Sequence, residues 1–299
     1  MQDFFETIGC AYLKNISLAP YTTLNIGGNA QYLAFPATVE QAIQILVFTK
    51  ERQIPCRILG RGANLLISDS GVLGIVLSTK RLNSIRVLGD TIEVGAGVPL
   101  GTLLSLCQRN ELQGLENLVG IPATVGGALA MNAGANGVEI SSAVIGISFY
   151  DSAGGTVCSL LPEEFAFRYR HSLCHEREGL VLSATFRLRK GKREEIFLKT
   201  KQIAAMRKEK QPLAYPSAGS VFLRPFPYYA PKLIEEAGLK GKIVGNAQIS
   251  TKHAGFIVNL GGAKAKDVNN LLCLAQNSVL EKFGIKMQPE IIFWGDFPG

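Results

Sequence analysis

The 299-residue sequence lacks the patterns that mark several common protein classes. It contains no internal repeat, no low-complexity tract and no Cys-x-x-Cys pair among its six cysteines. The cysteines lie in apolar segments, where a thiol behaves as a small hydrophobic group, so we expect a reducing compartment and a cytoplasmic protein. The first residues carry Asp3 and Glu6 where a secretory leader would be basic, so we expect no signal peptide.

Familiar nucleotide, hydrolase and metal motifs are also missing. No Walker A sequence occurs, and no glycine-rich stretch has the three glycines of the Rossmann fingerprint. Ser220 is followed two residues later by Phe222, where a hydrolase nucleophile elbow would have glycine. His171, Cys174 and His175 lie within five residues, but no second pair of ligands is near them. We therefore predict neither a serine hydrolase nor a metal site.

The charge balance is basic, with 31 Lys and Arg against 24 Asp and Glu. Such a balance suits nucleic acid, a membrane surface or a phosphorylated small molecule. The densest basic run, Arg187–Arg193, has no interleaved aromatic residues, so we expect a solvated turn and no nucleic-acid partner. The charge-free stretch Asn117–Val138 holds five Gly, Pro122 and three Asn, which suits no lipid-facing helix. We expect no membrane insertion, and we interpret this stretch as buried loop and strand around a ligand.

Hydrophobic periodicity and turn residues predict alternating helices and strands. Thr38 is a predicted N-cap, with Gln41 completing a capping box. The pattern of apolar and charged residues changes near residues 193–205, where we place a domain boundary. We place a lesser boundary near residues 70–80. The predicted helices are Val39–Gln53, Pro99–Asn110, Glu194–Lys210, Ala230–Ala237 and Lys266–Phe283. The predicted strands are Pro55–Gly60, Leu65–Ser68, Gly74–Ser78, Ile85–Leu88, Thr91–Val94, Val144–Tyr150, Thr156–Leu160, Leu180–Leu188, Gly255–Asn259 and Pro289–Gly295.

Two glycine-rich loops are the strongest binding signal. The first loop, Gly60–Leu65, comes directly after a predicted strand, and the second loop, Gly120–Gly127, is uncharged and stiffened by Pro122. Glycine allows sharp turns and leaves backbone N–H groups unscreened, which makes anion-binding concavities. Each loop taken alone can equally be a structural turn. Together they predict a site for a diphosphate and a flat ring system.

Three further residues are candidates for chemistry. Arg170 lies in an aromatic-flanked run, where its planar fork can hold a carboxylate or serve the structure. Ser220 follows a glycine and precedes an apolar segment, so it either presents its hydroxyl or is an ordinary turn residue. Glu290 opens an apolar terminal strand, where it is either a proton-transfer group or a salt-bridged strand end. Lys210 and Lys252 either meet a substrate phosphate or are solvated.

The order of these segments along the chain resembles the UDP-N-acetylenolpyruvoylglucosamine reductase family, flavoproteins that complete UDP-N-acetylmuramic acid in peptidoglycan synthesis. The resemblance covers residues 20–295, and the compact segment Ser217–Ser220 is similar to the shorter type of the family, without the extra tyrosine-bearing loop. The most specific segments are Ile121–Gly137, Pro216–Phe222 and His253–Asn259. The full series is Thr22–Gly28, Gly60–Leu65, Gly120–Glu139, Tyr169–Ser172, Lys210–Phe222, Lys252–Asn259 and Pro289–Glu290.

The resemblance implies an α+β fold. A p-cresol-methylhydroxylase-type FAD-binding domain would consist of residues 1–75 and 76–200, followed by a smaller α/β substrate-binding domain of residues 201–299. It implies non-covalent FAD, NADPH as the hydride donor, small-molecule substrates and a monomeric protein. The expected reaction is NADPH-dependent reduction of the enolpyruvyl group of UDP-N-acetylglucosamine enolpyruvate.

The resemblance also implies a role for each candidate. Hydride would reach C3 of the enolpyruvyl group by way of the flavin, Arg170 and Glu290 would stabilise the enol-like intermediate at the carboxyl group, and Ser220 would protonate C2. Cofactor contacts are implied for Gly60, Arg61, Gly62, Ala63, Asn64, Leu65, Gly120, Ile121, Pro122, Thr124, Gly126, Gly127, Asn132 and Gly134. Substrate contacts are implied for Tyr169, Lys210, Arg224, Lys252, His253 and Asn259.

The sequence departs from the family pattern at several of these positions. Ala63 stands where the family usually has Ser, which removes one hydroxyl donor to the diphosphate. Ala123 replaces a usual Gly and requires a negative φ or some strain. Arg224 stands where a substrate-contacting Asn is usual, which leaves open whether it takes over a contact to the UDP phosphates.

Two other functions remain to be distinguished. One is a flavin-dependent oxidase of the same fold, acting on another small substrate. No histidine lies near either glycine loop, which argues against a flavin tethered through His. The other is a non-catalytic protein that binds a nucleotide sugar or a nucleic acid. The lack of a stacking or groove-reading motif argues against nucleic acid.

Overall fold

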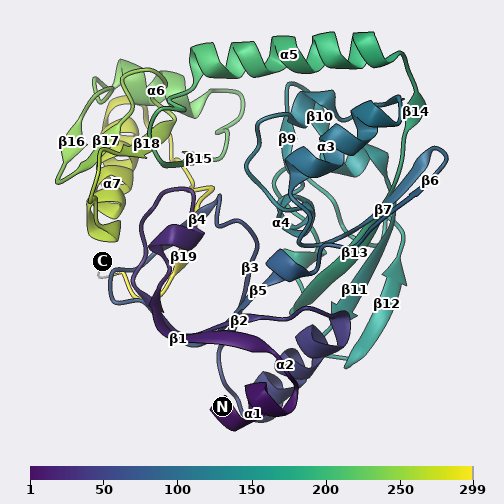
Figure 1. Cartoon of the computed structure of the whole chain (residues 1–299). Coiled ribbons are helices and arrows are strands. Elements are labelled where there is room, and N and C mark those ends of the chain that lie inside the picture. The colour runs from purple at the N-terminus through teal and green to yellow at the C-terminus, as the bar shows by residue number, and fades with distance from the viewer. Residues whose placement is uncertain (298–299) are drawn as a thin grey trace. The chain divides into compact units, whose positions relative to one another are not determined.

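The computed structural model describes residues 1–297 (Figure 1). Its α-helices are α1 (Gln2–Thr7), α2 (Val39–Glu51), α3 (Leu100–Arg109), α4 (Val125–Ala130), α5 (Arg193–Lys210), α6 (Ala230–Glu236) and α7 (Ala265–Phe283). The strands are β1 (Ala11–Ser17), β2 (Asn29–Phe35), β3 (Cys56–Leu59), β4 (Leu65–Ile67), β5 (Val72–Ser78), β6 (Ile85–Leu88), β7 (Thr91–Gly95), β8 (Leu112–Gln113), β9 (Gly134–Ala135), β10 (Val138–Glu139), β11 (Val144–Asp151), β12 (Thr156–Leu160), β13 (Gly179–Arg187), β14 (Arg189–Lys190), β15 (Ser217–Ser220), β16 (Ile243–Val244), β17 (Ala247–Ile249), β18 (Phe256–Asn259) and β19 (Ile292–Trp294).

The chain forms two compact units, and neither is a continuous stretch of sequence. Unit 1 consists of residues 1–14, 32–61 and 74–206. Unit 2 consists of residues 15–31, 62–73 and the part of the chain from residue 207 onward. The chain therefore changes unit within β1, β2, β5 and α5 and inside the first glycine loop. The three-domain division predicted from the sequence uses different ranges and stays a prediction.

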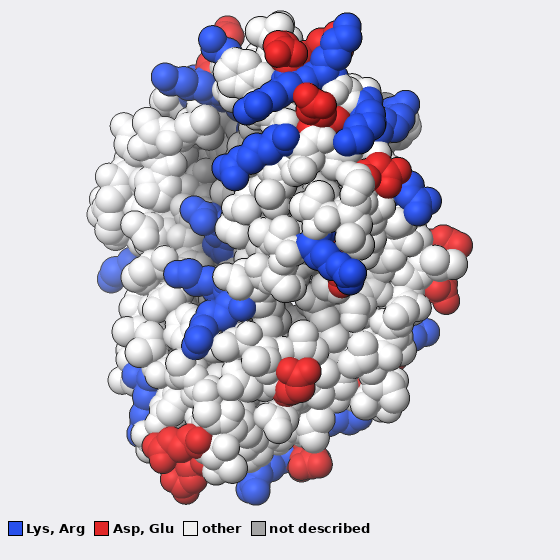
Figure 2. Space-filling view, turned by 45° about the vertical axis from the view of Figure 1, so that its right-hand side comes forward, with Lys and Arg blue, Asp and Glu red and all other residues white. Residues whose placement is uncertain are grey.

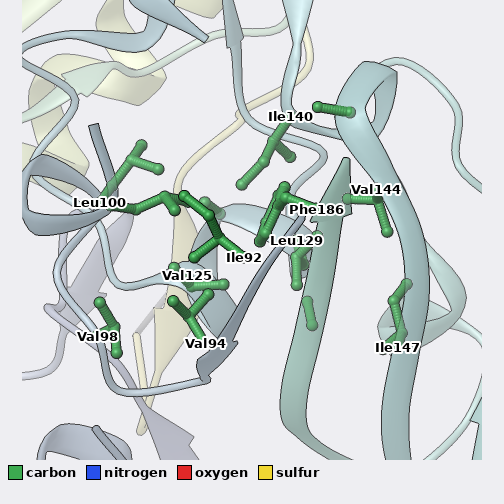
Figure 3. Close-up of a cluster of buried hydrophobic side chains, with 14 of the residues drawn as sticks. Ile92, Val94, Val98, Leu100, Val125, Leu129, Ile140, Val144, Ile147 and Phe186 are labelled. Atoms are coloured by element: carbon green, nitrogen blue, oxygen red, sulfur yellow. The ribbon is translucent and has the colours of Figure 1, made fainter. Parts of the chain in front are cut away.

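Unit 1 contains an antiparallel sheet in the order β12-β11-β13-β7-β6. The predicted hairpins are confirmed, and β6 and β7 join with Leu88 opposite Thr91. Helix α4 packs on this sheet through Val125 and Leu129, which share one buried cluster with Ile92 and Phe186 (Figure 3). The second glycine loop is therefore anchored in the core of unit 1.

A second buried cluster in unit 1 surrounds α1 and α2, where Phe5 and Ile45 are fully buried. The predicted N-cap of α2 is confirmed, because Thr38 Oγ1 accepts the N–H of Gln41 at 3.2 Å. The Gln41 side chain reaches the N–H of Ala37 at 2.8 Å, one residue before the group that a capping box would use. Strand β3 pairs in parallel with β5.

Unit 2 contains an antiparallel sheet in the order β15-β18-β17-β16, and α7 lies beside β16 and β17 (Figure 1). Its buried cluster includes Leu24, Ile26 and Leu66, which come from the two N-terminal segments of the unit. Strand β19 pairs in parallel with β4 from Ile292 opposite Leu65 onward. The terminal strand is therefore attached directly to the end of the first glycine loop.

All five predicted helices are present, but the interpretation of Asn117–Val138 as loop and strand was wrong in part. This stretch contains α4, a six-residue helix with two glycines that carries little helix propensity. Its formation depends on burial of Val125 and Leu129 and on Thr124, whose Oγ1 accepts the N–H of Gly127 at 3.3 Å. Strands β1 and β2 were not predicted. The run Arg187–Arg193 is also more than a turn, since β14 within it pairs with β8.

Helix α5 is the most polar of the long helices and carries both signs of charge. Figure 2 shows basic and acidic side chains side by side at the top of the face drawn. Within residues 1–297, no helix combines the length and the apolar character that crossing a bilayer requires.

Candidate functional site

The two glycine loops meet at Gly60 and Thr124, both in unit 1. A Cβ atom at Gly60 would lie 2.6 Å from Thr124 Oγ1, which is closer than a side chain can approach. The same hydroxyl caps α4 through Gly127. A side chain at position 60 would therefore displace the Thr124 hydroxyl that caps the N-terminus of α4.

The first loop offers a run of backbone donors. Gly62 has φ +62°, and a Cβ there would lie 2.4 Å from the Tyr21 carbonyl oxygen. In the described part of the chain, no protein group accepts a hydrogen bond from the backbone N–H groups of Arg61, Gly62, Ala63 or Asn64. Consecutive unsatisfied donors in a turn of this kind form an anion-binding concavity. The loop thus fits the diphosphate of a dinucleotide such as FAD.

The second loop differs from the sequence-based expectation that it supplies backbone donors to the diphosphate. Val125 donates to the Val98 carbonyl and Gly126 to the Ala96 carbonyl, both at 2.8 Å. The N–H of Ala123 likewise donates to Ile121 at 2.9 Å. The first two bonds hold α4 against the segment after β7 and the third stiffens the loop itself, so the second loop contributes a rigid, uncharged wall. Ala123 is absent from the residues of the described chain that have positive φ, so it carries no strain of that kind.

Arg170 lies at the tip of a tight turn in unit 1. The main chains of Arg168 and His171 donate to one another at 3.1 and 3.0 Å and leave Tyr169 and Arg170 between them. Arg170 has φ +54°, a region that L-residues seldom adopt. Its Nη2 donates to the Gly134 carbonyl at 3.2 Å, and its Cζ lies 5.2 Å from the centre of the Tyr169 ring. The guanidinium is therefore held in place by the hairpin of β9 and β10.

The His and Cys residues near this turn form no metal site. His171 Nε2 lies 2.8 Å from Glu176 Oε1, and Arg168 contacts the same carboxylate. The hydrogen bond from His171 lowers the pKa of Glu176, which suits a carboxylate in an ion-pair cluster. Burial raises the pKa of Cys174 to about 11, so its thiol is a poor ligand near neutral pH. Across residues 1–297, no three His, Cys, Asp or Glu side chains are grouped as a metal site would need.

Ser220 and Glu290 lie on adjacent backbone segments of unit 2. Ser220 ends β15 opposite Phe256, after an irregularity in the pairing between Ser217 and Ser220, and Gly219 within that interval has φ +76°. The N–H of Glu290 donates to the carbonyl of Val221 at 2.8 Å, so the acid is bound to the residue that follows the serine.

The first glycine loop joins this pair. Asn64 Nδ2 donates to the Glu290 carbonyl at 2.9 Å, and the Asn64 carbonyl accepts the N–H of Ile292 at 2.9 Å. The predicted diphosphate loop, acid and hydroxyl residues thus share one hydrogen-bonded frame. The family resemblance implied only a cofactor contact for Asn64, and no local signal in the sequence indicated this second role.

The predicted substrate residues fall into two groups, those with exposed side chains and those whose side chains form hydrogen bonds within unit 2. Tyr169, Lys210 and Arg224 have exposed side chains, and the Arg224 guanidinium lies 4.0 Å from the centre of the Tyr229 ring. Lys252 Nζ donates to the carbonyl of Lys208 near the end of α5 at 2.6 Å. It is therefore engaged with the protein.

His253 and Asn259 hold the local structure of unit 2. His253 Nδ1 accepts the N–H of Gly255 at 3.2 Å, and burial lowers the pKa of His253. The Asn259 side chain is buried, donates to the carbonyls of Leu24 and Asn25, and accepts from the N–H groups of Gly261 and Ala263. Its amide is fully engaged, which assigns it to positioning the adjacent loops.

Comparison with known proteins places these features in a family. Residues 211–294 match the family model described as UDP-N-acetylenolpyruvoylglucosamine reductase, C-terminal domain, and residues 30–160 match a model described as FAD binding domain. A relative named UDP-N-acetylenolpyruvoylglucosamine reductase from Caldicellulosiruptor bescii is 44% identical over 296 residues, which cover 98% of this chain and 94% of the relative. A relative of the same name from Lactococcus lactis is 40% identical over 282 residues, which cover 94% of each.

A solved structure indicates the same family. The crystal structure of UDP-N-acetylenolpyruvylglucosamine reductase from Thermus caldophilus superimposes with a TM-score of 0.81 at 35% identity, and covers 96% of this chain and 99% of that one. The predicted α+β fold class, with a flavin-binding part followed by a smaller substrate domain, is confirmed. The chain therefore belongs to the UDP-N-acetylenolpyruvoylglucosamine reductase family.

Proposed function

We propose that this chain is an NADPH-dependent flavoprotein that reduces the enolpyruvyl group of UDP-N-acetylglucosamine enolpyruvate to give UDP-N-acetylmuramate. The observation that carries the proposal is the frame in unit 2, where the loop suited to a diphosphate is hydrogen-bonded to Glu290 beside Ser220. Similarity at 40–44% identity over nearly the whole chain supports the choice of substrate.

FAD would be held without a covalent bond, with its diphosphate on the first glycine loop, and when bound it supplies the two-electron chemistry that links NADPH to the substrate. The N–H groups of Arg61, Gly62, Ala63 and Asn64 would face the phosphate oxygens. Because Ala63 has no hydroxyl, the backbone carries this recognition alone. The second loop would shape the site and exclude water.

Arg170 and Glu290 would act on the substrate carboxyl group. Addition of hydride to C3 of the enolpyruvyl group moves negative charge onto that carboxylate, so a fixed cation and a hydrogen-bonding acid beside it stabilise the intermediate. The turn between Arg168 and His171 holds the Arg170 guanidinium before substrate arrives, so little reorganisation accompanies the reaction.

Ser220 would complete the reduction by protonating C2. The C2–C3 double bond is lost, because C3 gains the hydride and C2 gains the proton of Ser220 Oγ. A serine hydroxyl is a poor acid in water, but it can serve against a strongly basic carbanion in a closed site. Its backbone position on β15, next to the residue bound to Glu290, suits this role.

The uridine diphosphate of the substrate would meet Tyr169, Lys210 and Arg224, whose exposed side chains supply two cations and a phenol. Lys252 and His253 would support this region, since both are engaged within unit 2. We further propose a monomeric, cytoplasmic enzyme. Six unpaired cysteines suit a reducing compartment, and sedimentation measurements would test the monomer.

A spectroscopic experiment tests the proposal directly. The purified protein is expected to show the visible spectrum of oxidised flavin, to bleach on anaerobic addition of NADPH, and to regain its colour on addition of UDP-N-acetylglucosamine enolpyruvate. A colourless protein that takes up no added FAD would contradict flavin binding. Recovery of colour with oxygen but not with the enolpyruvyl sugar would indicate an oxidase of the same fold.

The Ser220→Ala variant separates the two half-reactions. We expect nearly normal reduction of the flavin by NADPH and a loss of about 10²–10⁴-fold in the rate of reoxidation by the enolpyruvyl substrate, because a positioned proton donor is removed. Single-turnover stopped-flow measurements read each step. Ser217→Ala, on the same strand, is the matched control. Equal losses in both steps would contradict the role of Ser220.

A further inference from the structure

Asn132 is a buried polar residue whose side chain connects three segments of unit 1. Its exposed fraction is 0% and its φ is +40°. The amide Nδ2 donates to Glu139 Oε2 at 2.8 Å and to the Arg168 carbonyl at 3.1 Å, and Oδ1 accepts the N–H of Ser141 at 3.4 Å. Both donors of the amide are thus in use.

The groups that Asn132 binds are those that hold Arg170. Glu139 pairs with Gly134 across β10 and β9, and the Gly134 carbonyl accepts the Arg170 guanidinium. The Arg168 carbonyl also accepts the N–H of His171 and so closes the turn that carries Arg170. The Asn132 amide is therefore a bridge between the base of the turn and the hairpin that receives the guanidinium.

A second contact fixes the same turn from its other end. Ser172, which is fully buried, donates its hydroxyl to the carbonyl of Ala130 at 2.7 Å, at the end of α4. The turn is thus fastened at Arg168 and at Ser172, and Arg170 lies between the two anchors. Its positive φ makes such anchoring necessary, because an unsupported turn would relax to a more favourable backbone conformation.

We propose that Asn132 is a positioning residue for Arg170, acting through Glu139 and the Arg168 carbonyl, and that it makes no direct contact with the cofactor. This assignment differs from the cofactor contact expected from the sequence, and it rests on the proposed function of Arg170. The amide is suited to the role because it donates to two acceptors at once, one of them a carboxylate, and charge-assisted bonds are the stronger kind.

The Asn132→Ala variant of the full-length holoprotein tests this role. We expect flavin reduction by NADPH to stay within about threefold of the parent, and kcat of the oxidative half-reaction to fall about 10- to 100-fold, as misplacement of a catalytic group by about 1 Å does. Asn132→Asp is a second variant of equal volume, whose side chain cannot donate both of the hydrogen bonds to Glu139 and to the Arg168 carbonyl. Glu139→Gln keeps an acceptor for Nδ2 and is expected to lose less than either.

A control and a structural readout separate positioning from general damage. Asn110→Ala removes one side-chain hydrogen bond in unit 1, from the Asn110 Nδ2 to the carbonyl of Leu106, and is expected to leave both half-reactions unchanged. Hydrogen exchange of the apoprotein is expected to quicken in the peptide of residues 166–173 on Asn132→Ala, with other unit 1 peptides unchanged. Unchanged exchange in this peptide would overturn the proposal.

A double-mutant cycle decides between failure of this inference and failure of the proposed function. In an Arg170→Ala background, adding Asn132→Ala is expected to cost less than twofold more, because the group that Asn132 positions is gone. A full additional loss would overturn the positioning role while leaving Arg170 essential. If Arg170→Ala itself leaves the oxidative half-reaction intact, the proposed function of Arg170 is contradicted instead.

Discussion

Residues near the site adopt backbone conformations that are costly outside a fixed environment. Asn132, Asn136 and Arg170 have φ between +40° and +54°, and Gly62 has φ +62°. For a non-glycine residue such a conformation costs of order 1–3 kcal/mol and persists only where the surroundings enforce it. The backbone conformations of Asn132 and Arg170 are held by one set of connected hydrogen bonds. Sequence alone indicated the chemistry of Arg170 but not its conformation.

Ala63→Ser tests the diphosphate assignment at the level of one residue. The new hydroxyl adds a donor to a loop whose neighbouring N–H groups have no protein acceptor among the described residues. A net gain of about 0.5–1.5 kcal/mol per hydrogen bond predicts FAD binding that is roughly 2- to 10-fold tighter. Fluorescence titration of the apoprotein measures the Kd. Ala37→Ser, at an exposed site, is expected to leave it unchanged. Weaker binding on Ala63→Ser would count against contact between this loop and the phosphates.

Among the elements, α4 shows how packing forms a helix that its sequence disfavours. Gly126 is close to the segment after β7, and a Cβ there would lie 2.8 Å from the Ala96 Cβ. The approach allows the N–H of Gly126 to reach the Ala96 carbonyl. Gly126 therefore allows α4 to lie against the segment after β7, and the expected contact of the glycine pair with the cofactor stays a prediction.

Gly126→Ala is expected to destabilise the fold by about 1–3 kcal/mol, because the added methyl group overpacks a rigid contact. Gly101→Ala on α3, where no atom lies within 4 Å of the added Cβ, is the matched control. It is expected to be neutral or stabilising by up to about 1 kcal/mol, since Ala favours the helix. Urea unfolding followed by circular dichroism measures both. A neutral Gly126→Ala would show that α4 tolerates a wider spacing.

Helix α5 is attached to unit 1 by an ion pair with pH dependence. Glu116 is buried, accepts the N–H of Gly114 at 2.8 Å, and lies 2.9 Å from Lys199 Nζ. Burial raises the pKa of Glu116, but the hydrogen bonds from Lys199 and Gly114 outweigh it, so the pKa lies below its usual value. A lowered folded-state pKa contributes stability above the unfolded-state value, and this stability is lost as the pH falls through the folded-state pKa.

Glu116→Gln is therefore expected to destabilise the protein by about 1–3 kcal/mol at pH 7, because the partners of a buried charge are left unsatisfied. The difference from the parent should begin to shrink as the pH falls below about 4.3, the ordinary pKa of glutamate in an unfolded chain, and should vanish only below the lower folded-state pKa, where the folded parent is also neutral at this position. Denaturant unfolding at several pH values measures this. Glu195→Gln, which breaks the exposed pair with Lys192, should change stability by less than about 1 kcal/mol. A pH-independent difference for Glu116→Gln would contradict the ionic explanation.

On the scale of the whole molecule, each unit is assembled from separated segments. Residues 15–31 and 62–73 belong with the C-terminal part, and their side chains Leu24, Ile26 and Leu66 lie in its core. The first glycine loop is one of the places where the chain changes unit. A ligand held by that loop is expected to raise the free energy of unfolding.

Removal of FAD is expected to lower the free energy of unfolding, by an amount that depends on the logarithm of the FAD concentration relative to its Kd. Adding FAD to the apoprotein at about 100 times its Kd is expected to raise the free energy of unfolding by about 2.7 kcal/mol. Riboflavin, which lacks the diphosphate, should stabilise much less at the same concentration. Thermal unfolding at stepped ligand concentrations measures the difference. Equal stabilisation by riboflavin would contradict recognition through the diphosphate.

The sequence predicted much of the fold because its signals are local. The helices that became α2, α3, α5, α6 and α7 have clear periodicity, and the hairpins have turn residues at fixed positions. It missed β1, β2 and α4, and also β15, β16 and β17 of unit 2, because partners far away in the chain decide whether those segments pair or pack. Likewise the motif context of Arg170, Ser220 and Glu290 predicted their roles, which stay predictions, but it did not indicate the bonds that hold these residues.

The sequence by itself determined the family, the flavin chemistry and the residue types at the site, since these depend on short motifs in a fixed order. Only the tertiary structure decided which donors are available to a ligand. It showed that Val125 and Gly126 of the second loop donate their N–H groups to the segment after β7, while the first loop keeps four that no described protein group accepts. It also assigned Asn132 and Asn259 to protein contacts. The physical reason is that a backbone N–H carries a single hydrogen, so one used within the protein is not free for a ligand, and which acceptor is near depends on how distant segments fold together.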